Sequence, residues 1–179
     1  MPEETLIVED GTGKTDAESY ISVADADTYV AAYASAADNT AWDLLVVTAD
    51  KDKALRIGTQ YIDLEYGKKF AGYRTNETQA LSWPRTSVVD GDGYTIDSDE
   101  MPACLGKAVV EAALRYIAGD SLLGVQTTAA SISSETKKLG PMEKSTTYVG
   151  GKPPASVYPK IKALLAALLG NSSNTMERG

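Results

Sequence analysis

A glycine-rich stretch near the start of the chain, EDGTGKTD at residues 9–16, contains the Gly-Lys-Thr that ends a phosphate-binding loop. Such a loop also needs a glycine five positions before its second glycine, so that backbone N–H groups can wrap around phosphates. That position holds Val8, and Asp16 and Glu18 follow the lysine, where their carboxylates would repel phosphate. The stretch therefore predicts a surface turn, and Lys14 is not expected to bind a nucleotide.

An acidic cluster later in the chain, Asp90-Gly91-Asp92-Gly93, has the composition of a calcium-binding loop. A loop of that kind needs a glycine at its sixth position and a bidentate glutamate at its twelfth. Counted from Asp90, these positions hold Thr95 and Met101. The spacing therefore excludes this calcium site.

Histidine is absent from the chain. Its absence removes the usual general base near neutral pH, the serine and cysteine triads, and most zinc sites. The single cysteine, Cys104, lies in an apolar helical pattern that favours a small buried thiol over a nucleophile. No paired-carboxylate motif stands out either. The sequence therefore predicts no catalytic, metal-binding or cofactor-binding residues, and we do not expect an enzyme.

The charge balance is acidic, with a net charge of −8 and a pI near 4.6. Proteins owe most of their affinity for duplex DNA to Lys and Arg side chains that neutralise phosphates, so this balance argues against strong DNA binding. The N-terminus lacks the basic and apolar stretches of a signal peptide, and no apolar run reaches the roughly 20 residues of a membrane span. We expect a protein made in the cytoplasm.

Capping signals and the spacing of apolar residues predict four helices, within residues 22–35, 48–67, 101–120 and 157–170. Ser22 and Asp25 form a capping box at the start of the first helix, and Thr48 or Asp50 can cap the second. Gly67 is expected to end the second helix as its C′ residue. The inward face of the first helix is expected to contain Val23, Tyr29, Val30 and Tyr33.

The third helix carries the clearest apolar stripe and should be central to the core. The stripe consists of Leu105, Val109, Ala113 and Ile117. Lys107, Glu111 and Arg115 line the opposite face at four-residue spacing and are interpreted as a solvated ladder.

Two segments are not helical. Residues 67–100 form a long connection whose Trp, Pro and Tyr content favours an ordered loop. Residues 131–149 contain two Ser/Thr-rich runs around Leu139-Gly140-Pro141, which predicts a β-hairpin. Neither face of the hairpin is apolar enough to anchor it to a core, so it is either an exposed hairpin or an arm that an outside partner completes.

The predicted fold class is mainly α, a small bundle of about four helices with a long ordered loop and a protruding β-hairpin. Residues 1–170 are expected to form a single domain, with the hairpin arm at about residues 131–149. Residues 171–179 have nothing to bury and are expected to form a flexible C-terminal tail.

Three stretches give the chain a family resemblance: LIVEDGTGKTDAESYISVADADTY, DLEYGKKFAGYRTNETQALSWPRTSVVDGDGYTI and SSETKKLGPMEKSTTYVGGKPPASVYPKIKALLAALL. From Leu6 to about Leu169, the chain resembles the head–tail connector, or adaptor, proteins of tailed bacteriophages. The resemblance is specific because QALSWPR, DGDG and KLGPMEK occur together in one chain. Relatives are sometimes labelled DnaT-like, after a primosomal protein that binds single-stranded DNA.

This resemblance implies a structural virion protein that forms a ring, usually of twelve subunits, beneath the portal protein. The ring would sit in the virion neck, continue a channel that genomic DNA passes without specific binding, and join the head to the stopper or tail. The hairpin lysines would suit an acidic partner surface. The expected contacts with the portal or with neighbouring subunits are Lys137, Lys138, Leu139, Met142, Lys144, Tyr148, Tyr158, Met176 and Arg178.

The alternative function is the binding of single-stranded DNA, which needs a basic groove lined with aromatic rings on which bases can stack. The long loop offers such residues, namely Tyr73, Arg74, Trp83 and Arg85, together with Lys68 and Lys69. The competing interpretation is that Trp83 packs beneath the loop while the charges are solvated. The sequence favours the connector over this alternative.

Overall fold

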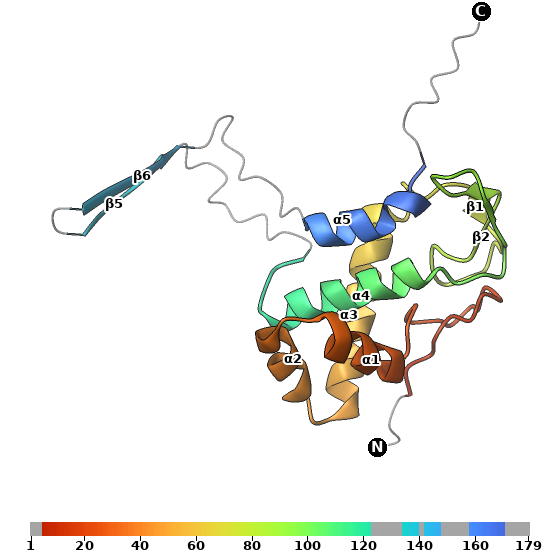
Figure 1. The fold of residues 1–179 in the computed structure, drawn as a ribbon, viewed down its shortest axis with the longest axis horizontal. Coiled ribbons are helices and arrows are strands. Elements are labelled where there is room, and N and C mark those ends of the chain that lie inside the picture. The colour runs from red at the N-terminus through yellow and green to blue at the C-terminus, as the bar shows by residue number, and fades with distance from the viewer. Residues whose placement is uncertain (1–4, 123–133, 140–141, 148–157, 171–179) are drawn as a thin grey trace, which may run out of the picture.

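The computed structural model describes residues 5–122, 134–139, 142–147 and 158–170. The helices in these ranges are α1 (Val23–Tyr33), α2 (Ala36–Asp43), α3 (Thr48–Tyr66), α4 (Ala103–Ile117) and α5 (Pro159–Leu165), and a 3-10 turn follows α5 at Ala166–Leu168. The strands are β1 (Tyr73–Arg74), β2 (Arg85–Thr86), β3 (Val88–Val89), β4 (Thr95–Ile96), β5 (Ser134–Leu139) and β6 (Met142–Thr147). The predicted fold class, mainly α with a β-hairpin, is confirmed (Figure 1).

Two helices begin at a serine cap. At the start of α1, Ser22 Oγ accepts a hydrogen bond from the backbone N–H of Asp25 at 3.1 Å, as the capping box predicts. At the start of α2, Ser35 Oγ accepts the same bond from Asp38 at 3.1 Å. α2 was not among the predicted helices, although its first four residues carry the same signal as those of α1.

α3 differs from its predicted form at both ends. Its N-cap is Val47, which offers no side-chain hydrogen bond, so neither Thr48 nor Asp50 caps the helix. At the other end, Gly67 has a right-handed φ of −53° and not the left-handed conformation of a C′ glycine. A glycine is needed there for space, because a Cβ atom would collide with the carbonyl oxygen of Asp63.

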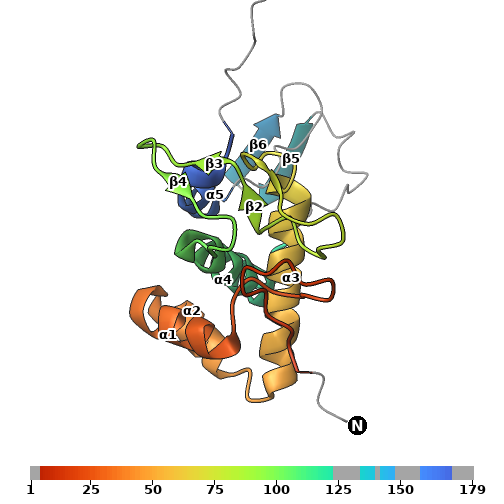
Figure 2. The ribbon, with the colours of Figure 1, turned by 90° about the vertical axis from the view of Figure 1, so that its right-hand side faces the viewer.

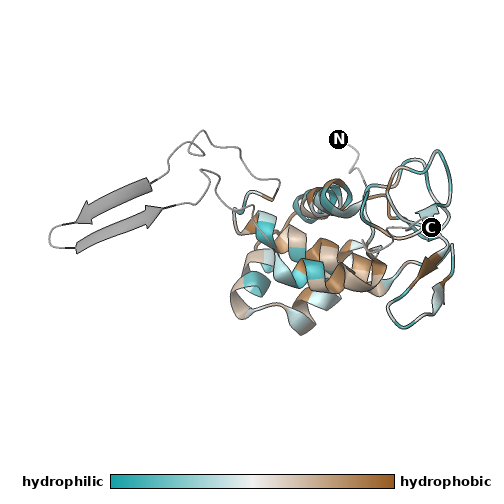
Figure 3. Ribbon diagram, turned by 90° about the horizontal axis from the view of Figure 1, so that it is seen from above, coloured by the Kyte–Doolittle hydropathy of each residue, from teal (hydrophilic) through white to brown (hydrophobic). Residues whose placement is uncertain are grey.

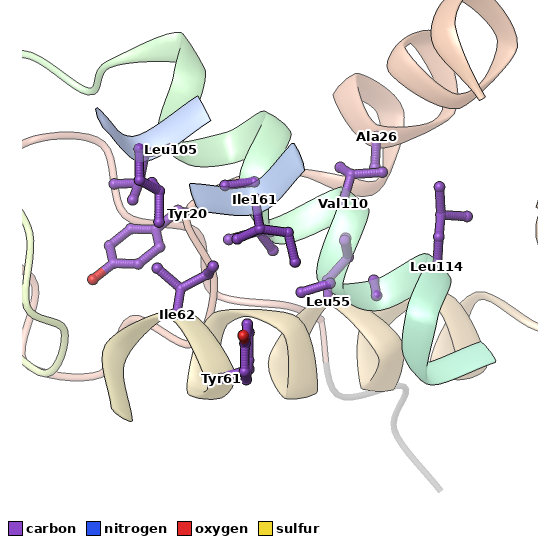
Figure 4. Close-up of a cluster of buried hydrophobic side chains, with 14 of the residues drawn as sticks. Tyr20, Ala26, Leu55, Tyr61, Ile62, Leu105, Val110, Leu114 and Ile161 are labelled. Carbon is purple, nitrogen blue, oxygen red and sulfur yellow. The ribbon is translucent and has the colours of Figure 1, made fainter. Parts of the chain in front are cut away.

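α3 and α4 form the centre of the helical body. α4 crosses α3, with α5 packed on one side of α4 and with α1 and α2 on the other (Figures 1 and 2). Leu55 and Ile62 of α3, Leu105 and Val110 of α4 and Ile161 of α5 meet in one buried cluster (Figure 4). Hydrophobic residues accordingly gather on these central helices (Figure 3). Burial of this cluster fixes the positions of α3, α4 and α5 relative to one another.

α4 is buried around most of its circumference. Val109, in the middle of the predicted stripe, is fully buried. Glu111 is only 3% exposed, so the interpretation of this residue as part of a solvated ladder was wrong. The reason is that Tyr29 of α1 and Lys160 of α5 both contact the Glu111 carboxylate, while Lys107 and Arg115 are half-buried.

The connection between α3 and α4 is ordered, as predicted. β1 pairs with β2 and β3 with β4, both antiparallel. The chain turns into β1 at Gly72, whose φ of 67° favours glycine. A side chain at this position would also collide with the carbonyl oxygen of Thr86. This position therefore accepts only glycine.

β5 and β6 form an antiparallel ribbon that pairs Ser134 with Thr147 at one end and Leu139 with Met142 at the other. This β5–β6 ribbon confirms the predicted hairpin and stands apart from the helical body in Figure 1. The rest of the predicted arm and the predicted tail, at residues 131–133, 140–141, 148–149 and 171–179, lie outside the described residues.

In the part of the chain that the structure describes, no helix is both long and apolar enough to cross a lipid bilayer. The same residues contain no cluster of His, Cys, Asp and Glu side chains that could hold a metal ion.

Candidate nucleic-acid interface

Trp83, the tryptophan of the sequence-based nucleic-acid site, lies inside the fold. It is fully buried, and its ring lies 6.0 Å from the ring of Phe70 in an edge-on contact. Its Nε1 donates a hydrogen bond to the carbonyl oxygen of Glu100 at 2.9 Å. A buried ring has no free face on which a base could stack. The competing interpretation, in which Trp83 packs beneath the loop, is confirmed.

Arg85 is also withdrawn from solvent. Its guanidinium donates hydrogen bonds to the carbonyl oxygens of Ala71 (2.6 Å), Gly72 (2.7 Å), Ser82 (3.1 Å) and Phe70 (3.4 Å). Burial lowers the pKa of this guanidinium. The donors that would grip a phosphate are therefore committed to the backbone, and Arg85 ties two segments of the loop together.

Tyr73, Arg74 and Lys68 are exposed, but their surroundings do not favour phosphate. The guanidinium of Arg74 donates to the carbonyl oxygens of residues 77 and 79, and Lys69 pairs with Glu65 at 2.5 Å. The same connection contains six carboxylates, those of Glu77, Asp90, Asp92, Asp97, Asp99 and Glu100. A DNA backbone would meet more negative than positive charge on this loop.

The N-terminal glycine-rich loop does hold an anion, but the anion is a side chain of the same loop. The buried Glu9 carboxylate accepts hydrogen bonds from the backbone N–H groups of Gly11 (3.0 Å), Gly13 (2.9 Å) and Lys14 (2.9 Å). Positive φ angles of 98° at Gly11 and 74° at Gly13 turn these groups inward. Lys14 pairs with Asp10 at 3.0 Å. The loop's converging donors are thus used internally and are not free for a phosphate.

Positive charge is unevenly distributed along the chain. Four cations that precede α4 are paired with carboxylates: Lys14 with Asp10, Lys51 with Asp27, Arg56 with Glu18 and Lys69 with Glu65. From residue 103 onward, the sequence contains nine Lys and Arg residues against five Asp and Glu residues. The part of the chain that begins with α4 is therefore net basic, which the overall charge of −8 conceals.

Two lysines and two tyrosines line up where α1, α4 and α5 meet. The ring centroids of Tyr29 and Tyr33 lie 5.1 Å apart, and the two ring planes form an angle of 33°. Lys107 Nζ lies 5.9 Å from the centre of the Tyr33 ring, and Lys160 Nζ lies 5.9 Å from the centre of the Tyr29 ring. We call these four residues the tyrosine–lysine strip. Tyr29 is buried as predicted, but Tyr33 is 66% exposed, so its predicted inward position was wrong.

A buried carboxylate holds the strip together. Glu111 Oε1 accepts a hydrogen bond from the Tyr29 hydroxyl at 2.9 Å and lies 2.5 Å from Lys160 Nζ. Burial and this hydrogen bond raise the pKa of Tyr29, which therefore stays a neutral donor. Because an unpaired buried carboxylate is costly, these contacts stabilise the junction of the three helices.

A pocket of about 230 Å³ lies beside the strip, between α4 and α5. Its lining includes Arg115, Tyr158 and Lys160, with the carboxylates of Glu111 and Asp120. Within the described residues, Arg115 forms no ion pair. The pocket therefore contains two cations and two carboxylates, and of these only Lys160 and Glu111 form an ion pair.

The segment between α4 and α5 leaves and returns at this pocket. Asp120, just after α4, and Tyr158, just before α5, both line it. Residues 123–133 and 148–157, which join this part of the chain to the β5–β6 ribbon, lie outside the described residues. In the register of the ribbon, Lys137 is paired with Lys144.

The expected connector contacts are distributed over several parts of the chain. Lys137, Lys138 and Leu139 lie in β5, Met142 and Lys144 lie in β6, Tyr158 is the N-cap of α5, and Tyr148, Met176 and Arg178 lie outside the described residues. The sequence-based site contained no residue of the strip. The excess of cations after residue 103 is a signal that could have directed attention to α4 and α5.

The model of a family described as "Putative DnaT-like ssDNA binding protein" matches residues 4–179. Comparisons with curated proteins and with solved structures gave no match. The family match supports the alternative that the sequence disfavoured, and the expectation of a structural head–tail connector of the virion neck was wrong. Because the match extends over almost the whole chain, the protein belongs to this DnaT-like family.

Proposed function

We propose that this protein binds single-stranded DNA on the tyrosine–lysine strip. The observation that carries the proposal is the exposed ring of Tyr33 with Lys107 Nζ at 5.9 Å, next to a pocket that contains Arg115. Proteins that bind single strands combine aromatic rings, on which bases stack, with cations that follow the phosphates. The strip brings both together on one side of the helical body.

Each residue of the strip would have a separate role. Tyr33 would offer the ring for stacking, and Tyr29 would support it from the buried side. Lys107 has no ion-pair partner within the described residues, so it can approach a phosphate without giving up a carboxylate. Because the bases of a duplex are already stacked on one another, duplex DNA would lose the contact with Tyr33 and bind more weakly.

The β5–β6 ribbon would add cations to the same path. Lys137 is paired with Lys144 in the register of the ribbon, and Lys138 follows Lys137 in β5. These lysines would contribute charges that neutralise phosphates. A two-stranded ribbon is marginally stable alone in water, so it would also gain order from the contact. We expect the double substitution Lys137→Gln and Lys144→Gln to reduce the salt dependence of DNA binding.

Fluorescence anisotropy with a labelled oligothymidylate of about 20 nucleotides, between roughly 50 and 300 mM NaCl, tests the proposal. A stacked base contributes about 1–3 kcal/mol, so Tyr33→Ala should weaken binding roughly 5- to 100-fold. Lys107→Gln should weaken binding and lower the salt slope by about 0.7.

The chain provides matched controls for both substitutions. Tyr94 is a tyrosine with 74% exposure on the acidic loop, and Lys53 is an exposed lysine of α3. Tyr94→Ala and Lys53→Gln should leave the affinity unchanged. The proposal fails if the wild-type protein does not bind at the lowest salt concentration, or if Tyr94→Ala weakens binding as much as Tyr33→Ala does.

A further inference from the structure

The pocket between α4 and α5 contains a cation that is paired with a buried carboxylate but is itself exposed to solvent. Lys160 Nζ lies 2.5 Å from Glu111 Oε1, yet the Lys160 side chain is 55% exposed. We infer that this pocket is a subsite for a DNA phosphate, and that Glu111 competes with the phosphate for Lys160. The inference rests on the proposed function and names the site and the residue that limit the affinity.

The lining of the pocket offers a phosphate group two cations, Arg115 and Lys160, beside the carboxylates of Glu111 and Asp120. Arg115 offers a guanidinium with no carboxylate partner within the described residues, and the planar fork of arginine matches phosphate oxygens. The volume of about 230 Å³ is several times the roughly 30 Å³ that one water molecule occupies in the liquid. A phosphate that enters would lie between Arg115 and Lys160.

Only one partner of the ion pair can move. Glu111 is 3% exposed and is also bonded to the Tyr29 hydroxyl, so its carboxylate stays in place. Ile161, next to Lys160, is buried against α3 and α4 and anchors α5 (Figure 4). The Lys160 side chain can therefore turn from Glu111 towards a phosphate while the helices remain where they are.

This exchange would keep DNA binding weak and reversible. When Lys160 turns to a phosphate, Glu111 retains the hydrogen bond from Tyr29 but loses its cation, and its negative charge also repels the phosphate. Glu111 is thus a positioning residue that acts on DNA through Lys160. Its charge, and not only its shape, should set the affinity.

The experiment is the same anisotropy titration over a range of NaCl concentrations, with variants that change the competition in opposite directions. Glu111→Gln keeps an acceptor for Tyr29 and removes the charge, so binding should tighten about tenfold and the salt slope should steepen by about 0.7. Tyr29→Phe removes the other partner of Glu111 and should weaken binding severalfold, because Glu111 then depends on Lys160 alone.

Lys162 provides the matched control, since it is an exposed lysine of the same helix that does not line the pocket. Lys160→Gln should weaken binding, and Lys162→Gln should not. Failure of the wild-type protein to bind oligothymidylate would overturn the proposed function itself. If the wild type binds and Glu111→Gln has the same affinity and salt slope, only the phosphate subsite is refuted. If Glu111→Gln does not fold, equal affinities of the Lys160→Gln and Lys162→Gln variants for oligothymidylate refute the phosphate subsite.

Discussion

Arg85→Ala tests whether the connection between α3 and α4 depends on a buried guanidinium. Its two shortest hydrogen bonds, to the carbonyl oxygens of Ala71 at 2.6 Å and Gly72 at 2.7 Å, would be lost. A hydrogen bond to a charged group contributes about 1.5–3 kcal/mol, so these two together give a loss of about 3–6 kcal/mol. Because domains are typically stable by about 5–15 kcal/mol, the variant should be close to unfolding at room temperature.

Urea unfolding followed by tryptophan fluorescence measures this loss, since the buried Trp83 lies in the same connection. With a slope of about 2 kcal/mol per molar urea, the midpoint should fall by about 1.5–3 M. Arg74→Ala is the matched control, because Arg74 is paired opposite Arg85 in β1 and β2 but is exposed. Its midpoint should shift by less than about 0.5 M. Equal shifts for the two variants would refute the structural role of Arg85.

Val109→Asp places an unpaired carboxylate at a fully buried position of α4 and should cost several kcal/mol; a soluble protein with an unchanged melting temperature would contradict the packing of this helix. Glu9→Ala removes the acceptor of the converging N–H groups and should lower the melting temperature, whereas Lys14→Ala should change the melting temperature little. ATP binding by the wild type that disappears in Lys14→Ala would contradict the internal role of the loop. The hydrogen bond from Arg56 lowers the pKa of Glu18, so this contact stabilises the fold fully above the unfolded pKa near 4.5, and its contribution is lost as the pH falls through the lower folded pKa. Thermal melts of Arg56→Gln should show a smaller loss of stability over that acidic range than melts of the wild type.

The helices could largely be predicted because their signals are local. The contact of Ser22 with Asp25 spans a single turn, and the same signal at Ser35 would have revealed α2. The burial of Glu111 has no such signal. Its partners Tyr29 and Lys160 lie on two other helices, so only the packed structure shows that the middle of an apparent charge ladder is enclosed.

The candidate nucleic-acid interface was harder to predict, because it too depends on contacts between residues of different helices. Trp83 was considered because tryptophan and arginine lie close together in a polar loop. In the structure its ring is buried against Phe70 and is hydrogen-bonded to the backbone, so it does not reach the surface. Tyr33 looked like a core residue because its helical spacing matches that of Tyr29. Within the described residues, Tyr33 and Lys107 come together where α1, α4 and α5 meet, and only the packed structure shows this surface.

The route of the chain between α4 and α5 has a consequence for how this fold can vary. The chain packs in the helical body as far as Leu122, which is buried in the core, and it re-enters the body at Tyr158; Asp120 and Tyr158 line the same pocket. The intervening residues are a detour, because α4 and α5 make their mutual contacts without it. Shortening the detour would favour the folded helices slightly, since each halving of a loop saves about 0.6 kcal/mol of closure entropy. Its length and charge can thus change without disturbing the contacts between α4 and α5.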